Sequence, residues 1–115
     1  MFPRFLCYDT KKRKNQYDID VFDNGNIVAN LFVIEDLAAI RHICGAVQLD
    51  GRYECAFIRY LIDTYHPKWI AINNRYQLAI QACEELNFER HHVSLVDGKR
   101  YVYMMEKNTI GDVSV

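Results

Sequence analysis

The stretch from Val47 to Phe88 constrains the fold of this chain more than any other. It begins with a short glycine-containing segment and continues with apolar residues at helical spacing from Arg52 to Tyr65, after which Pro67 prevents the helix from extending. Trp69 to Ile72 is almost continuously apolar, which is typical of a strand buried on both faces. The predicted order is therefore strand, glycine-containing loop, helix, strand, helix, strand.

The second helix of this stretch is predicted to begin after Asn73 or Asn74 and to end at Leu86. Either asparagine can cap the helix start, because its side-chain oxygen accepts a backbone N–H bond from the first turn. Asn87 then suits the left-handed conformation that often follows a helix. The residues expected to face inward are Leu78, Ala79, Ala82, Cys83 and Leu86.

A hairpin is predicted in the first half of the chain around Asn24 and Gly25, a pair that readily adopts positive φ angles. Alternating apolar residues on both sides of this turn predict strands at 17–22 and 27–34. On the second of these strands, the residues expected to share one buried side are Ile27, Ala29, Leu31 and Val33.

Two further regions complete the predicted strands. The aromatic-rich segment from Phe2 to Asp9 is expected to be a first strand, followed by a solvated, charged turn from Lys11 to Asn15. Near the end of the chain, Asp97-Gly98 is a second strong turn pair, so we expect a closing hairpin between residues 88–96 and 99–106.

The segment from Glu35 to Val47 fits two structures. Its apolar residues at helical spacing are Leu37, Ile40, Ile43 and Cys44, and Asp36 could cap such a helix. Residues 39–43 also fit a strand with a bulge near its end. We favour a turn followed by a strand, because of the loop and helix that come next.

Length and charge exclude several classes of protein. A chain of 115 residues has room for one domain, which we place at residues 1–107 with a tail at 108–115. The formal net charge is -1, so neither nucleic acid nor a membrane is the expected partner. The apolar runs fall short of the roughly 20 residues that span a bilayer, and the N-terminus lacks a signal-peptide pattern. We expect an intracellular, cytoplasmic protein.

No metal site is predicted. The chain has four cysteines: Cys7, Cys44, Cys55 and Cys83. They form no C-x-x-C pair, and we expect them to be buried thiols in a reducing compartment. His91 and His92 are adjacent, and on a regular strand they would point to opposite faces. They are therefore expected not to chelate a metal together.

The predicted order of elements over residues 17–106 resembles the GNAT (GCN5-related N-acetyltransferase) fold. The resemblance is carried by residues 40–43, by Val47, and by Ala79-x-x-x-Cys83-Glu84-Glu85-Leu86-Asn87-Phe88, where the family typically reads A-x-x-x-Y-e-k-l-G-F. It implies one α+β (or α/β) domain with a mixed, mostly antiparallel sheet of about six to seven strands and two main helices. The helices that usually follow the family's first strand have no room here. The chain also resembles small, trimmed proteins of this fold from tailed phages.

The resemblance implies acetyl-CoA as the cofactor, bound at a Q/R-x-x-G-x-G/A loop. Backbone N–H groups at the start of the next helix approach the cofactor's pyrophosphate there. One alignment, Gln48-x-x-Gly51-x-Tyr53, keeps the glutamine and one glycine, whereas another places residues 49–54 on the motif. In both, the second small residue is lost and Asp50 and Glu54 add negative charge. The cofactor contacts implied, if acyl-CoA binds, are Gly51, Arg52, Asn73 and Asn74.

The family's general acid, which protonates the departing thiolate, is often the tyrosine of the last helix. Cys83 stands at that position and is expected to be a core residue. Tyr76, earlier in the same segment, could substitute, although a tyrosine on an amphipathic helix usually serves packing. Cys83 and Tyr76 are therefore the catalytic candidates if the chain is an enzyme.

These departures lead us to expect a non-catalytic or catalytically impaired domain that needs no cofactor. We expect it to act by binding a protein partner, for example as a virion-associated or host-directed (inhibitor) protein of a phage. The eight tyrosines fit either a contact surface or the lining of a sheet, and we leave both open. The alternative is a minimal acyl-CoA-dependent N-acetyltransferase that uses acetyl-CoA. Nucleic-acid binding through the basic run at Lys11–Lys14 is a third, disfavoured hypothesis, and the sequence does not predict the oligomeric state.

Overall fold

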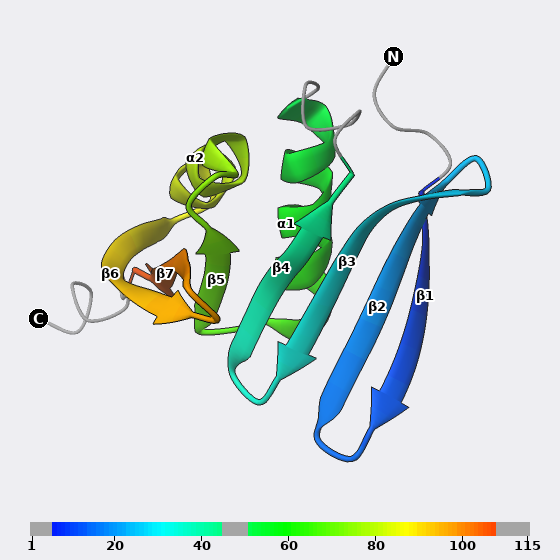
Figure 1. The fold of residues 1–115 in the computed structure, drawn as a ribbon, viewed down its shortest axis with the longest axis horizontal. Coiled ribbons are helices and arrows are strands. Elements are labelled where there is room, and N and C mark those ends of the chain that lie inside the picture. Colours follow the sequence, from blue (N-terminus) through cyan, green and yellow to red (C-terminus); the bar gives the residue numbers. More distant parts are fainter. Residues whose placement is uncertain (1–5, 45–50, 108–115) are drawn as a thin grey trace, which may run out of the picture.

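Two helices and seven strands make up the part of the chain, residues 6–44 and 51–107, that the computed structural model describes (Figure 1). Their bounds are β1 (Leu6–Arg13), β2 (Gln16–Asp23), β3 (Asn26–Ile34), β4 (Leu37–Ile43), α1 (Gly51–Tyr65), β5 (Trp69–Asn73), α2 (Gln77–Glu85), β6 (Phe88–Val96) and β7 (Lys99–Glu106). Neither of the described helices is long and apolar enough to cross a membrane.

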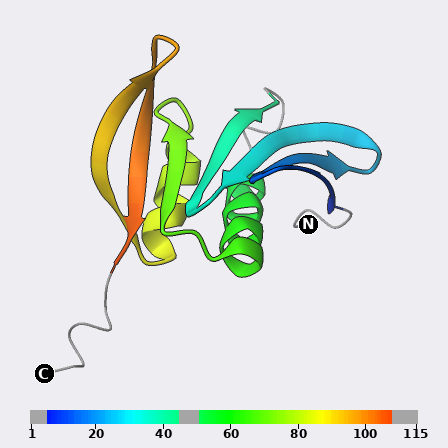
Figure 2. The same cartoon turned by 90° about the horizontal axis from the view of Figure 1, so that it is seen from below.

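The seven strands form one sheet in the order β1-β2-β3-β4-β5-β7-β6. β4 and β5 run parallel, and each of the other neighbouring pairs is antiparallel. Both helices lie on the same side of the sheet and pack against each other (Figure 2). The fold class predicted from the sequence is thereby confirmed.

The core lies between this face of the sheet and the two helices. Its largest fully buried residues on the sheet are Ile19, Leu31, Ile40, Ile43, Ile70, Ile72 and Met104. From α1, Phe57, Ile58 and Leu61 fill the same space, as the helical spacing predicts. Ala71 is also buried, so the expectation that β5 is covered on both faces is confirmed.

Both predicted hairpin turns are confirmed by their backbone angles. Asn24 and Gly25 have φ angles of 54° and 85°, and Asp97 and Gly98 have 52° and 76°. Such pairs of positive φ angles match the twist of the strands that they join. Asn87, with a φ of 75°, adopts the left-handed conformation expected after α2.

The segment after β3 is a turn followed by a strand, as favoured from the sequence. Glu35 has a φ of 51° in that turn, and β4 then pairs with β3 from Leu37 to Ile43. A helix there would leave β3 and β5 without the strand that joins them, because β4 lies between the two in the sheet. The bulge expected at residues 43–45 extends beyond the described residues, and the loop expected after Val47 lies outside them up to Gly51.

The charged turn expected at residues 11–15 is shorter than predicted. β1 continues through Arg13, and only Lys14 and Asn15 connect it to β2. Lys11 pairs with Asp18 across the two strands, so that opposite charges face each other. The connection therefore has no helices, as the sequence indicates, but the basic run belongs mainly to a strand.

Two residues expected in the core are exposed. In the first hairpin the register shifts between Val21 and Phe22, so Val28 becomes an extra residue and Ile27 is 50 % exposed. In α2, Leu78 is 40 % exposed, because the helix starts later than predicted and presents Ile80 to the core instead.

The histidine pair also departs from its expected geometry. The register of β6 shifts between Arg90 and His92, so a bulge interrupts the alternation of side chains at this point. The Nδ1 atoms of His91 and His92 are 2.8 Å apart, and both rings contact Trp69. The prediction that the two imidazoles point to opposite faces is therefore wrong. Among the described residues no three His, Cys, Asp or Glu side chains gather as a metal site.

The tyrosines divide between the two faces of the sheet. Tyr8 of β1 and Tyr60 of α1 stack with ring centroids 3.6 Å apart, whereas the rings of Tyr17 on β2 and Tyr65 on α1 are tilted by 46° with centroids 5.3 Å apart. These rings line the helix-covered face. Tyr103 lies on the opposite face, which no helix among the described residues covers.

The Tyr8–Tyr60 stack makes the stability of the fold sensitive to alkaline pH. Burial, with a smaller contribution from Tyr60, raises the pKa of Tyr8 from its ordinary value of 10.0 to about 12. Folding thus favours the neutral phenol, and this contribution is fully present below pH 10 and lost as the pH rises towards 12. We expect Tyr8→Phe to reduce the loss of stability between these pH values, measured by urea unfolding.

Burial also raises the pKa of Tyr65, so the pH dependence should decrease rather than disappear. Tyr101→Phe, on the uncovered face, is the matched control and should keep the wild-type slope. An unchanged slope in Tyr8→Phe would contradict the assignment.

Candidate active site at the ends of β4 and β5

β4 and β5 pair only over the first four residues of each strand. Their parallel register runs from Leu37 and Trp69 to Ile40 and Ile72, and Figure 1 shows the two strands separating beyond that point. β4 contains a bulge there. Asn30 and Leu31 are adjacent in β3, but their partners in β4, His42 and Ile40, are separated by one extra residue. Bulges are frequent beside active sites, where they redirect side chains and end the pairing of strands. We call residues 41–43 of β4 and 73 of β5 the divergent ends.

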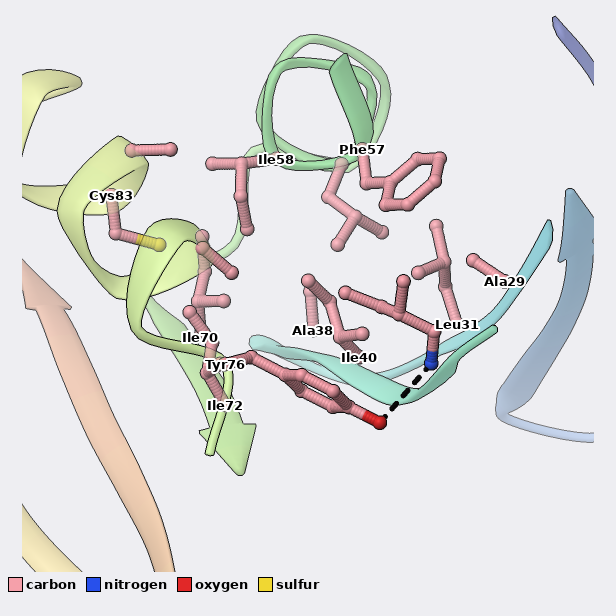
Figure 3. Packing of buried hydrophobic residues seen from close by; sticks show 14 of the residues in the cluster. Ala29, Leu31, Ala38, Ile40, Phe57, Ile58, Ile70, Ile72, Tyr76 and Cys83 are labelled. Atoms are coloured by element: carbon pink, nitrogen blue, oxygen red, sulfur yellow. Dashed lines mark hydrogen bonds between the residues drawn. The ribbon is translucent and has the colours of Figure 1, made fainter. Parts of the chain in front are cut away.

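Tyr76 reaches across the divergent ends from the start of α2. Its hydroxyl oxygen accepts a hydrogen bond from the backbone N–H of Ile43, at a distance of 3.2 Å (Figure 3). The side chain is 4 % exposed, so this bond is shielded from water. A tyrosine hydroxyl has one proton to donate and can accept bonds as well. Because this hydroxyl accepts from Ile43, its own proton can be donated to another acceptor.

A turn after β5 directs Tyr76 to this position. The backbone N–H of Tyr76 donates to the carbonyl of Asn73 at 2.9 Å, and the N–H of Arg75 donates to Asn73 Oδ1 at 3.0 Å. The N–H of Asn74 donates to the carbonyl of Arg100 at 2.9 Å, which fixes the turn to β7. The turn therefore places Tyr76 beside β4 rather than on the solvent side of α2.

The predicted caps of α2 are wrong. The helix starts at Gln77, and the N-cap position is held by Tyr76, which makes no side-chain cap bond. Asn73 and Asn74 instead form the preceding turn: the Asn73 side chain bonds Arg75, and Asn74 Oδ1 accepts from the Gln77 side chain at 3.2 Å. They lie near the divergent ends, but their amide groups serve the backbone of the turn.

Cys83, the other catalytic candidate, lies inside the core. Figure 3 shows its side chain among the apolar residues between α2 and α1. Burial, with a smaller contribution from the charge of Glu84, raises the pKa of the thiol well above its ordinary value. The thiol is thus held neutral in the core, and the structure brings Tyr76, not Cys83, to the end of β4.

The start of α1 is the remaining part of the predicted site. Gly51 is the first residue of α1, whereas the predicted loop before it lies outside the described residues. Glu54 in the first turn is 2 % exposed. The hydroxyl of Tyr53 bonds the carboxylate of Asp23, which ties this turn to β2. A carboxylate in the first turn stabilises the helix through its dipole, but it opposes a second anion at the same place.

The divergent ends are compatible with the acyl end of acyl-CoA. A buried hydroxyl that a backbone N–H holds in place is a donor suited to a thioester. The first turn of α1 is less suited to a pyrophosphate. At an effective dielectric near 20, a carboxylate about 4 Å from a phosphate charge costs roughly 4 kcal/mol. The fit therefore rests on Ile43 and Tyr76.

No protein-family model and no curated protein matches the sequence. Solved structures do match the fold. A protein of unknown function from Aquifex aeolicus has a TM-score of 0.64 at 11 % identity, over 94 % of this chain and 70 % of that one. The spermidine/spermine N-acetyltransferase SpeG from Vibrio cholerae has a TM-score of 0.53 at 16 % identity, over 79 % of this chain and 66 % of that one.

The aminoglycoside acetyltransferase AAC(6')-Ib, solved with acetyl-CoA, has a TM-score of 0.50 at 15 % identity. The match covers 86 % of this chain and 68 % of the enzyme. At these identities the comparisons establish the fold alone, and the fold is that of the GNAT acetyltransferases. The chain spans about two thirds of the length of the two enzymes.

These matches correct the expectation of a non-catalytic binding domain without a cofactor. The structural neighbours with a stated activity are acetyltransferases, and one of them is solved with acetyl-CoA. The expectation depended on losing the tyrosine at position 83 and on the altered loop. The sequence did not reveal that another tyrosine, seven positions earlier, reaches β4. The findings favour the alternative, an acyl-CoA-dependent N-acetyltransferase.

Proposed function

We propose that this protein is an acyl-CoA-dependent N-acyltransferase, with acetyl-CoA as the simplest donor. The observation that carries the proposal is the bond between the Tyr76 hydroxyl and the backbone N–H of Ile43, at the place where β4 and β5 separate. The fold supports it, because solved structures of similar fold include acetyltransferases.

When bound, acyl-CoA supplies an acyl group activated as a thioester, which an amine can attack. The residue that would hold this end of the cofactor is Tyr76, through its hydroxyl, which the backbone N–H of Ile43 positions. The bond from Ile43 fixes the position of the Tyr76 oxygen and leaves its proton at the site, where it can pass to a departing sulfur. Burial of the ring excludes water from this bond. The phosphates would lie at the start of α1, at Gly51, where the Glu54 carboxylate weakens the attraction of the helix N-terminus for an anion.

Acetyl-CoA is expected to raise the melting temperature of the protein. A ligand that binds with a micromolar Kd and is present at millimolar concentration stabilises the folded state by roughly 4 kcal/mol. Gly51→Trp is expected to abolish the rise, because a large side chain at the start of α1 blocks access to its backbone N–H groups. Thermal unfolding with and without acetyl-CoA measures both effects.

Thr64→Trp is the matched control, since it places the same side chain at an exposed position near the other end of α1. This variant should respond to acetyl-CoA as the wild type does. The proposal fails if 1 mM acetyl-CoA, about a thousand times a micromolar Kd, leaves the wild-type melting temperature unchanged.

A further inference from the structure

The uncovered face of the sheet contains an aromatic pocket that the proposed acyl transfer does not use. It is a hollow of about 250 Å³ lined by Leu37, Trp69, His92 and Tyr103, which come from β4, β5, β6 and β7. It lies at the beginning of β4 and β5, whereas Tyr76 and Ile43 lie at the opposite, divergent ends. We call this hollow the aromatic pocket.

Its rings form walls at different angles. The rings of His92 and Tyr103 are stacked within 9° of parallel, with centroids 4.8 Å apart. Trp69 stands at 67° to His92 and at 84° to His91, with centroid distances of 5.9 Å and 5.0 Å. The bulge in β6 makes this arrangement possible, because it brings both histidine rings to Trp69.

An acidic residue, Glu89, lies on the face of the sheet that contains the aromatic pocket. Glu89 pairs with Met105 across β6 and β7, and Met105 in turn pairs with Trp69 across β7 and β5. Since cross-strand partners share a face, the Glu89 carboxylate belongs to the same face as the pocket. Arg90 alternates to the other face, where it bonds Glu84 of α2 at 3.3 Å. Aromatic faces attract alkylammonium groups, which are apolar on their surface yet carry a positive charge.

From this geometry we propose that the aromatic pocket binds an alkylated ammonium group. The methyl groups of such a cation match the apolar rings and Leu37, and its charge is attracted by the ring faces and by Glu89. The inference is independent of acyl transfer, since none of the residues that form the pocket takes part in the site at the divergent ends.

Trp69 allows a direct binding test, because it is the single tryptophan of the chain. Its fluorescence is titrated with choline and, separately, with 3,3-dimethyl-1-butanol, the uncharged compound of the same shape. The titrations are run without acyl-CoA, at constant ionic strength and at pH 8, where an ordinary imidazole is neutral. We expect choline to bind about fivefold or more tightly than the neutral compound, as a cation–π contribution predicts.

Substitutions separate the aromatic contribution from simple apolar packing. Tyr103→Leu keeps an apolar wall but removes the ring face, so it should weaken choline by about fivefold and leave the neutral compound nearly unchanged. Tyr101→Leu, on the same strand and face but outside the lining, is the matched control and should bind choline as the wild type does. Glu89→Gln should weaken choline alone.

A peptide with one trimethyl-lysine carries the same trimethylammonium group on a polypeptide. Comparing its affinity with that of choline shows whether the pocket prefers the group on a small molecule or on a protein. Equal binding of choline and the neutral compound to the wild-type protein would overturn the proposal, as would no response to either. The proposal would also be overturned if the Trp69 fluorescence changed with the protein concentration but not with either ligand, because a second copy of the chain would then cover the pocket. Failure of acetyl-CoA to bind would leave these measurements unaffected.

Discussion

Tyr76→Phe is expected to lower kcat for acyl transfer by about 10²- to 10⁴-fold, the usual contribution of a positioned proton donor. The change keeps the ring and removes the hydroxyl that accepts from Ile43. Because that bond is buried, the variant should also lose about 1–3 kcal/mol of stability. Steady-state kinetics with acetyl-CoA and an amine acceptor, together with thermal unfolding, separates the loss of activity from the loss of stability.

Cys83→Ala is the decisive comparison, since Cys83 stands where the family has its acid. With the thiol buried in the core, this variant should retain most of the activity and lose only the stability that a small cavity costs. The reverse result, an inactive Cys83→Ala beside an active Tyr76→Phe, would refute the assignment of Tyr76.

Phe57→Ala is expected to destabilise the fold by about 3–5 kcal/mol. Phe57 is fully buried, and Figure 3 shows it pointing from α1 towards Leu31 and Ala29 of β3. Truncating the ring removes the apolar contact between α1 and the sheet and leaves a cavity that the β-sheet cannot close. The melting temperature should fall by on the order of 15 °C in a domain of this size.

Arg59→Ala tests whether this loss is specific to the core. Arg59 lies on the exposed side of the same helix, so its truncation should change the stability by about 0.5 kcal/mol at most. Similar losses in the two variants, measured by urea unfolding at neutral pH, would mean that α1 does not pack on the sheet through Phe57.

The elements of this fold follow from local patterns wherever one residue pair or one periodicity decides the structure. Asn24-Gly25 and Asp97-Gly98 define two hairpins because few other pairs adopt two positive φ angles. The apolar run of β5 predicts burial on both faces, and Ile70, Ala71 and Ile72 are all buried.

The bulges in the first hairpin and in β6 were not predicted, and they account for the errors at Ile27 and at the histidine pair. One extra residue reverses the alternation of side chains, so Ile27 becomes exposed while Val28 is buried. The same effect in β6 brings His91 and His92 together, although a regular strand would separate them. Whether a bulge forms depends on pairing with the neighbouring strand, and the sequence of one strand does not contain that information.

The candidate site was only partly predictable for a similar reason. Tyr76 was identified as a possible substitute for the family's tyrosine, but its partner Ile43 is 33 positions away and interacts through its backbone. Almost every residue type carries a backbone N–H, so a sequence motif does not show which N–H forms part of a site. The assignment of Asn73 and Asn74 as helix caps was wrong because the turn they form delays the helix until Gln77.

The edge strand β1 has a consequence for the behaviour of the protein at high concentration. An edge strand offers unpaired backbone groups to another chain, and consecutive charges are one way in which proteins prevent such pairing. Lys11, Lys12 and Arg13 are three successive cations on this edge. Two copies that approached edge to edge at this part of β1 would oppose like charges along the contact. The basic run thus acts as a barrier to fibrous aggregation, a property that apolar substitutions at these positions would remove.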